Sequence, residues 1–311
     1  MSNVGWTPLT LATAAVVGGM ILHAEQRPLF RSDVELISLT VSVTGPGGRH
    51  VSGLTADDFD IFEDGRPQEL GYFAPANTAL SVSLLLDSSS SMEESMPLAQ
   101  KAATEFVTKL RASDVAQVVD FDSRVEVLQP FTNNRALLET AIQRTHAGGS
   151  TALYNAVYIA LRQFEKMRGR TPDEVGREVI VLLSDGDDTS SLVTFDELLD
   201  TAKRAQTVIY TIGLGLEDPA GRVMPANGEF GLRRLAQETG GRMFLAKRPE
   251  DLSNVYMQIA DELTSQYVLG YLSRNERRDG GWRSIAVRVH QPQLQARTRA
   301  GYYATARSNS P

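Results

Sequence analysis

The chain has 311 residues, of which 42% are hydrophobic and 22% are charged, so its length favours two folded units and its composition excludes wholesale disorder. Its net charge of −7 argues against nucleic acid as a partner, because an acidic surface repels phosphate backbones. The absence of cysteine excludes disulfides, zinc–thiolate centres and thiol nucleophiles.

An uncharged, largely apolar run extends from Trp6 to Leu22 and is followed at once by polar residues. Its length suits an export signal or a short membrane anchor, although no Lys or Arg precedes it and Leu22 is not the small residue of a cleavage site. An apolar helix packed on the protein is the alternative. We expect residues 1–26 to be a signal peptide or anchor, which predicts an exported protein in the periplasm, on the cell surface or secreted.

Residues 28–78 are predicted to form β structure. Apolar residues alternate between Asp33 and Thr44, and the glycine-rich segment 45–48 must turn the chain. A second apolar run ends at Phe62 and is followed by Asp64-Gly65, a strong hairpin signal because both positions need a positive φ. These strands are too few to be stable alone.

Short apolar runs alternate with helical patterns from residue 79 to residue 266. This alternation predicts a mainly parallel sheet that is covered by helices on both faces. The predicted strands are Val82–Leu86, Val115–Phe121, Val179–Leu183, Val208–Ile212 and Met243–Leu245, and the predicted helices cover 97–111, 152–166, 194–206 and 249–266.

The β pattern returns after Tyr267, where Ile285, Val287 and Val289 alternate with polar residues. Because β segments flank the α/β region, we expect 267–304 to pair with 28–78 in one small β unit into which the α/β domain is inserted. Residues 305–311 are predicted to be a flexible tail.

Three loops of the α/β region carry side-chain oxygens. Asp87-x-Ser89-x-Ser91 follows the first predicted strand, a Gly-Gly-Ser-Thr segment ending at Thr151 opens a helix, and Asp185 follows another strand. The carboxyl ends of parallel strands share one edge, so the two carboxylates would repel unless a cation lay between them. Carboxylates and hydroxyls favour Mg²⁺ or Mn²⁺ and, less readily, Ca²⁺.

These loops resemble the metal-ion-dependent adhesion site of von Willebrand factor A domains. The similarity covers about 80–266, and it implies a Rossmann-like, doubly wound, mainly parallel sheet of six strands. One Asp-x-Ser-x-Ser motif is weak evidence, but five ligand positions in the family's order are a specific signal. The matching residues are Asp87, Ser89, Ser91, Thr151 and Asp185.

The wider chain also resembles A-domain proteins that are abundant in acidobacteria. The similar segments are 53–59, 62–68, which contains Glu-Asp-Gly-Arg-Pro-Gln, and the closing Gly-Tyr-Tyr-Ala at 301–304. This second resemblance implies little about activity.

The family resemblance implies a protein-binding module rather than an enzyme. Ser89 and Ser91 would bind the cation directly, and the other three residues would complete its shell directly or through water. A partner's Asp or Glu would then replace one water on the cation. Specificity would come from the loops 92–96, 144–149 and 187–193. In some members of the family the last helix, here 249–266, shifts when ligand binds, although a helix that simply packs is the simpler expectation.

Two other functions stay open at this point. A haloacid-dehalogenase-type phosphatase also uses Mg²⁺ and an Asp after a strand, but it requires a second Asp where this chain has Ser89. The chain has no phosphate-binding loop with Lys and so is not itself an ATPase, but it could serve a separate ATPase as a partner. A serine hydrolase would need a Gly-x-Ser-x-Gly elbow, which is absent. Near the site, His146 is predicted to be an exposed loop histidine, and Asp187-Asp188 a solvated turn rather than a second cation site.

Overall fold

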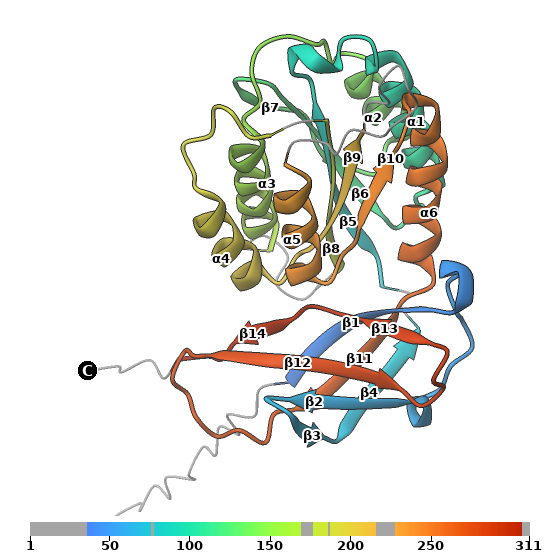
Figure 1. Ribbon diagram of the computed structural model, residues 1–311, viewed down its shortest axis with the longest axis vertical. Helices are drawn as coiled ribbons and strands as arrows, with labels where there is room; N and C mark the ends of the chain where they lie inside the picture. Colours follow the sequence, from blue (N-terminus) through green and yellow to red (C-terminus); the bar gives the residue numbers. More distant parts are fainter. Residues whose placement is uncertain (1–35, 76–77, 169–176, 186, 216–227, 307–311) are drawn as a thin grey trace, which may run out of the picture. The chain divides into compact units, whose positions relative to one another are not determined.

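The computed structural model describes residues 36–75, 78–168, 177–185, 187–215 and 228–306 (Figure 1). The apolar run at 6–22 and most of the predicted tail lie outside these ranges, so the predictions for them stay predictions. Within the described part of the chain, no helix combines the length and the apolar character that a membrane crossing requires.

The α/β region contains one six-stranded sheet, in the order β10-β9-β8-β5-β6-β7. Neighbouring strands are parallel except β7, which is antiparallel to β6 and forms one edge. The central strand β5 is buried along its whole length. The strands are β5 (Leu80–Asp87), β6 (Val115–Phe121), β7 (Val125–Thr132), β8 (Arg177–Ser184), β9 (Val208–Leu214) and β10 (Met243–Ala246).

Helices cover both faces of this sheet because side chains of each strand alternate between two apolar clusters. On β5, Leu84 and Leu86 join the cluster of α1, α2 and α6, whereas Leu85 joins that of α3, α4 and α5. Figure 1 shows the two helix layers on either side of the strands. The helices are α1 (Met96–Lys109), α2 (Arg135–Ile142), α3 (Leu153–Arg168), α4 (Phe195–Ala205), α5 (Glu229–Thr239) and α6 (Leu252–Thr264).

The segments before and after the α/β region form two four-stranded antiparallel sheets, in the orders β13-β1-β11-β4 and β14-β12-β2-β3. One apolar core, which includes Leu39, Ile61, Leu269 and Tyr302, draws residues from both sheets. The strands are β1 (Leu36–Thr44), β2 (Phe59–Glu63), β3 (Arg66–Gln68), β4 (Leu70–Pro75), β11 (Tyr267–Leu272), β12 (Trp282–Val289), β13 (Gln295–Arg297) and β14 (Gly301–Tyr303).

N-terminal and C-terminal strands are paired directly, β1 with β11 and β2 with β12. The predicted fold class, a doubly wound six-stranded α/β domain inserted in a β-sandwich-like unit, is therefore confirmed. The predicted hairpin is also present: Asp64 and Gly65 have φ of 48° and 75° and join β2 to β3. Ala306 still forms a bridge with Asp279, so strand-like pairing extends into the first residues of the predicted tail.

Candidate functional site

The centre of the sheet positions the first oxygen-bearing loop. Strand β5 lies between β8 and β6. After β5 the chain continues to β6 on one side, whereas the later strands β8, β9 and β10 lie on the other side. This is the topological switch point of an open α/β sheet, where the loops diverge and leave a crevice for ligand. Asp87 ends β5, and Asp185 follows directly after β8.

Asp87 is fully buried and is held in place by neighbouring donors. Its Oδ1 accepts a hydrogen bond from the backbone N–H of Ser89 at 2.8 Å, and its Oδ2 accepts one from the hydroxyl of Ser184 at 2.6 Å. Because both oxygens accept hydrogen bonds, the carboxylate cannot rotate freely. Its position in the site is therefore fixed.

A continuous chain of hydrogen bonds connects the remaining oxygens of the first and third loops. The hydroxyls of Ser89 and Ser91 lie 3.1 Å apart, and the Ser91 hydroxyl donates to Oδ1 of Asp185 at 2.9 Å. Neighbouring ligands of an octahedral ion bound at about 2.1 Å are themselves about 3 Å apart. The spacing of these oxygens therefore fits the shell of a small hard cation.

The second loop is joined to the first through its backbone. The N–H of Gly148 donates to the carbonyl of Ser88 at 2.7 Å, and the N–H of Ser90 donates to the carbonyl of Gly149 at 3.1 Å. Thr151 is 6% exposed, and its carbonyl accepts a hydrogen bond from the N–H of Thr189 at 2.8 Å. Thr151 therefore lies on the same edge, although its hydroxyl makes no hydrogen bond to the other four residues in the described structure.

Burial raises the pKa of several carboxyl groups at this edge. The pKa of Asp87 rises to about 6 because the group is buried, and the negative charge of Asp185 adds to the rise. Burial likewise raises the pKa of Asp120 to about 6, and it raises the pKa of Asp185. Carboxylates that are crowded away from water in this way are stabilised by a positive charge placed between them.

The side chains gathered at this edge offer oxygen atoms as donors. Among the described residues, no group of three or more His, Cys, Asp or Glu side chains is placed to hold an ion. Any ion at this edge would depend on two carboxylates together with hydroxyl oxygens. Mg²⁺ accepts such a set because it retains several waters, whereas softer metals prefer nitrogen or sulfur.

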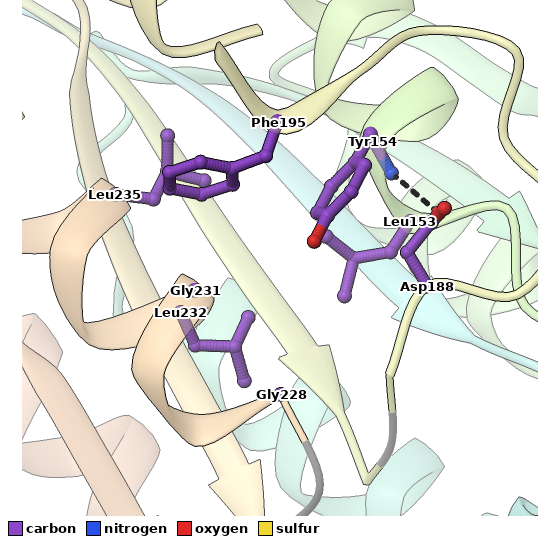
Figure 2. A pocket seen from close by; sticks show the side chains of 8 residues that line it. All are labelled: Leu153, Tyr154, Asp188, Phe195, Gly228, Gly231, Leu232 and Leu235. Carbon is purple, nitrogen blue, oxygen red and sulfur yellow. Dashed lines mark hydrogen bonds between the residues drawn. The ribbon is translucent and has the colours of Figure 1, made fainter.

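The third loop is braced by Asp188. Its Oδ1 accepts hydrogen bonds from the N–H of Tyr154 at 3.1 Å and from the hydroxyl of Ser191 at 2.5 Å, so it caps the start of α3. Figure 2 shows this contact beside the Tyr154 ring, which packs edge-on against Phe195 with ring centres 5.7 Å apart. The cavity at this point measures about 10 Å³, which is room for about one water. It is a packing gap rather than a ligand pocket.

Gly149 occupies a position of the site that cannot accommodate a side chain without strain. Its φ is +76°, and an added Cβ would lie 2.9 Å from Oδ2 of Asp122. We expect Gly149→Ala to lower the free energy of unfolding by about 1–3 kcal/mol, because backbone strain and a steric clash add. Urea denaturation measures this loss. Gly148→Ala is the matched control, since a Cβ there meets nothing within 4 Å, and an equal loss in both variants would contradict the prediction.

The sequence as a whole matches a known domain family. The profile of the von Willebrand factor type A domain matches residues 81–258, which is more than half of the chain. The chain belongs to the von Willebrand factor type A family. This family membership agrees with the placement of the three oxygen-bearing loops at the switch point of the sheet.

Relatives of this von Willebrand factor type A protein carry no assigned activity in their names. A UPF0353 protein of Nocardia farcinica is 28% identical over 233 residues, which is 64% of this chain and 68% of that protein. A UPF0353 protein of Mycolicibacterium gilvum is 26% identical over 217 residues, 63% of this chain and 64% of its own length. The narrower resemblance to acidobacterial proteins finds no support in these comparisons.

A solved structure supports the fold. The von Willebrand factor type A protein of Catenulispora acidiphila superposes with a TM-score of 0.51 at 14% identity, over 89% of this chain and 76% of that one. At this identity the likeness shows the fold alone.

Three residues of the site were not predicted from the sequence. Ser184 fixes Asp87, Thr189 binds the backbone of Thr151, and Asp120 contributes a further, half-buried carboxyl group. Ser184 and Thr189 flank Asp185 closely in sequence, but Asp120 belongs to a different strand and gave no local signal. His146 is exposed, and its Nδ1 contacts the carbonyl of Arg144 at 2.5 Å, as expected of a loop histidine.

Proposed function

We propose that this protein is a non-enzymatic binding module that holds one divalent cation and uses it to bind a carboxylate of a protein partner. The observation that carries the proposal is the set of hydrogen bonds at the switch point of the sheet: the backbone N–H of Ser89 donates to Asp87, and the hydroxyls of Ser89 and Ser91 continue the chain to Asp185. The five proposed ligands are Asp87, Ser89, Ser91, Thr151 and Asp185, and the preferred cation is Mg²⁺ or Mn²⁺ rather than Ca²⁺.

Each residue has a distinct part in this proposal. Ser89 and Ser91 would bind the cation directly through their hydroxyl oxygens. Thr151, Asp87 and Asp185 would complete its shell directly or through bound water, and the two carboxylates would supply negative charge. The cation, when bound, offers an exchangeable position to a partner's Asp or Glu. Its charge makes the bond strong in a partly desolvated site, whereas the surrounding loops determine which partner fits.

Capture of a partner from the native cell envelope tests this function. The protein is immobilised in Mg²⁺, washed, and eluted with excess EDTA. We expect the partner to elute with EDTA and to be absent when Asp87→Ala is used as bait. Equal capture in Mg²⁺ and in EDTA would rule out cation-mediated binding.

A phosphatase of the haloacid-dehalogenase type is the enzymatic alternative. It is disfavoured because Ser89 occupies the position of its second carboxylate, and the Ser89 hydroxyl contacts the Ser91 hydroxyl instead. Release of phosphate from a model phosphomonoester that depends on both Mg²⁺ and Asp87 would establish the enzyme and contradict the binding module.

Export is part of the same proposal and rests on residues 6–22 of the sequence. Fractionation of cells that express the full chain tests it, with recovery in the envelope or outside the cell expected. Recovery in the cytoplasm would instead favour the role of a partner subunit for a separate ATPase.

Cation affinity should depend on pH because Asp87 must be ionised to bind. With a pKa of about 6, the Asp87 carboxyl is about one-tenth ionised at pH 5, so affinity there should be about tenfold lower than at pH 7.5. The raised pKa of Asp185 acts in the same direction. Calorimetry in two buffers of different ionisation enthalpy measures both the affinity and the protons released. An affinity that is constant from pH 5 to pH 7.5 would contradict this prediction.

A further inference from the structure

The β-sandwich unit carries a cleft that the cation site does not explain. It has a volume of about 560 Å³ and is lined by the hairpin of β2 and β3 and by the segment that leads into β12. Four arginines line it against two carboxylates, although the whole chain is acidic. We name it the arginine cleft. Its charged lining residues are Glu63, Asp64, Arg66, Arg274, Arg277 and Arg283.

The two carboxylates of the arginine cleft are already satisfied. Glu63 is 2% exposed and accepts hydrogen bonds from the hydroxyls of Tyr271, Ser273 and Tyr302 at 2.8, 2.8 and 3.1 Å. Asp64 accepts from both the N–H and the hydroxyl of Ser284, at 2.9 and 3.1 Å. Neither carboxylate is hydrogen-bonded to an arginine of the cleft within the described residues, so neither serves as the partner of Arg66 or Arg277.

Two of the four arginines are available to a ligand. The guanidinium groups of Arg66 and Arg277 make no hydrogen bond and no ion pair with any residue that the structure describes. The pKa of Asp279 is lowered mainly by the hydrogen bond from the N–H of Gly281, and the charges of Arg283 and Arg277 add to this. Arg274 is paired with the exposed Glu69 at 3.0 Å. The cleft therefore presents two guanidinium groups that have no direct carboxylate partner among the described residues.

The walls of the arginine cleft are held in a fixed arrangement. The N–H of Arg274 donates to Oε1 of Gln68 at 3.2 Å, which attaches the loop to β3. Arg283 is 6% exposed and donates to the carbonyl of Arg277 at 2.9 Å and to Oδ1 of Asp279 at 3.1 Å. A site whose walls are already ordered loses little entropy when a ligand binds.

We propose that the arginine cleft binds an acidic polypeptide segment through its Asp or Glu carboxylates. Guanidinium groups recognise carboxylates by paired, charge-assisted hydrogen bonds. Nucleic acid is a poorer occupant, because the chain has a net charge of −7 and no aromatic ring lines the cleft to stack on bases. Pro67 in the short edge strand β3 disfavours the addition of a further strand, so side chains carry the recognition.

Hexaglutamate labelled with a fluorophore is the probe, and its anisotropy is measured with the full chain in excess EDTA so that the cation site cannot contribute. We expect binding that weakens with added salt, and a loss of about tenfold or more in Arg66→Gln/Arg277→Gln, because two charge-assisted contacts are removed. The matched control is Arg248→Gln/Arg288→Gln, which removes the same charge at exposed positions outside the cleft and should change affinity less than about twofold.

Two results would overturn the proposal. They are no binding of hexaglutamate to the wild-type chain and an equal loss of affinity in the two double variants. Far-ultraviolet circular dichroism and the unfolding midpoint of each variant establish that the chain is folded. Because the measurement is made without divalent cations, its outcome is independent of the proposed function of the cation site.

Discussion

Asp87→Asn should abolish cation binding and at the same time stabilise the cation-free protein. Binding is expected to weaken by about 100-fold or more, because the central carboxylate of the site is removed while the shape of the side chain is kept. The second effect follows from burial. The pKa of Asp87 is raised from its ordinary value of 3.8 to about 6, so the ionised carboxylate is unfavourable in the folded state.

The sign of this stability effect depends on pH. A raised pKa in the folded state means that the wild-type protein loses stability as pH increases from about 4 through about 6. At pH 7.5 the cost is up to about 3 kcal/mol, and the Asn variant should be more stable by that amount in EDTA. Below pH 4 the difference should disappear. Urea denaturation in EDTA across this range measures it.

Asp187→Asn is the matched control for this variant. Asp187 lies in the third loop, is exposed, and is not among the five proposed ligands. It should retain cation binding and show no gain in stability in EDTA. An Asp87→Asn protein that still binds Mg²⁺ with wild-type affinity would remove Asp87 from the site.

Arg297→Met should cause the largest loss of stability, about 3–5 kcal/mol, because it leaves a buried carboxylate without its cation. Glu262 of α6 is fully buried, and its Oε1 accepts hydrogen bonds from Arg297 of β13, from Ser42 of β1 at 2.8 Å and from Tyr210 of β9 at 2.6 Å. Gln266 extends the network by donating to the hydroxyls of Ser42 and Tyr210, at 3.1 and 2.9 Å. Thermal and urea unfolding at pH 7 measure the effect.

A double variant separates the lost charge pair from other damage. Glu262→Gln in the Arg297→Met background removes the unpaired charge and leaves the hydroxyl donors in place, so most of the stability should return. Arg288→Met, at an exposed position of β12 where the guanidinium stacks on the Phe62 ring, should change stability by less than about 1 kcal/mol. If the double variant is no more stable than Arg297→Met, the loss does not come from the buried charge.

The same network bears on the last helix of the domain. Glu262, near the end of α6, and Gln266, two residues beyond it, are hydrogen-bonded to side chains of β1 and β9. A shift of α6 would therefore have to break several buried hydrogen bonds. This favours the simpler expectation that the helix packs in place, and movement of α6 on ligand binding stays a prediction.

The strands that lie in the middle of the sheet could be predicted because each is a short, uninterrupted apolar run. The prediction failed at one edge of the sheet, formed by β7, and at the helices α2 and α5. Strand β7 was missed because Pro130 interrupts its pattern, which a central strand would not tolerate but an edge strand does. Helix α2 has 8 residues and buries three of them, so its periodic signal is weak. Helix α5 is as long as the predicted α4, but it contains Gly231 in its first turn, and an internal glycine weakens a helical pattern.

The candidate cation site could be predicted because its residues are concentrated in short motifs at strand and helix ends. The Glu262 network and the arginine cleft could not be predicted in this way. Ser42 is separated from Glu262 by 220 residues, and Asp64 from Ser284 by the same number, so their pairing depends on how the two ends of the chain fold together. A single sequence contains no local signal for such contacts.

Calorimetric titration of the purified, folded protein with Mn²⁺ or Mg²⁺ tests the proposed cation site most directly. One cation should bind per chain at pH 7.5, and binding should be absent in Asp87→Asn and retained in Asp187→Asn. A folded wild-type protein that takes up no divalent cation would contradict the proposed function, whereas the von Willebrand factor type A fold would remain as described.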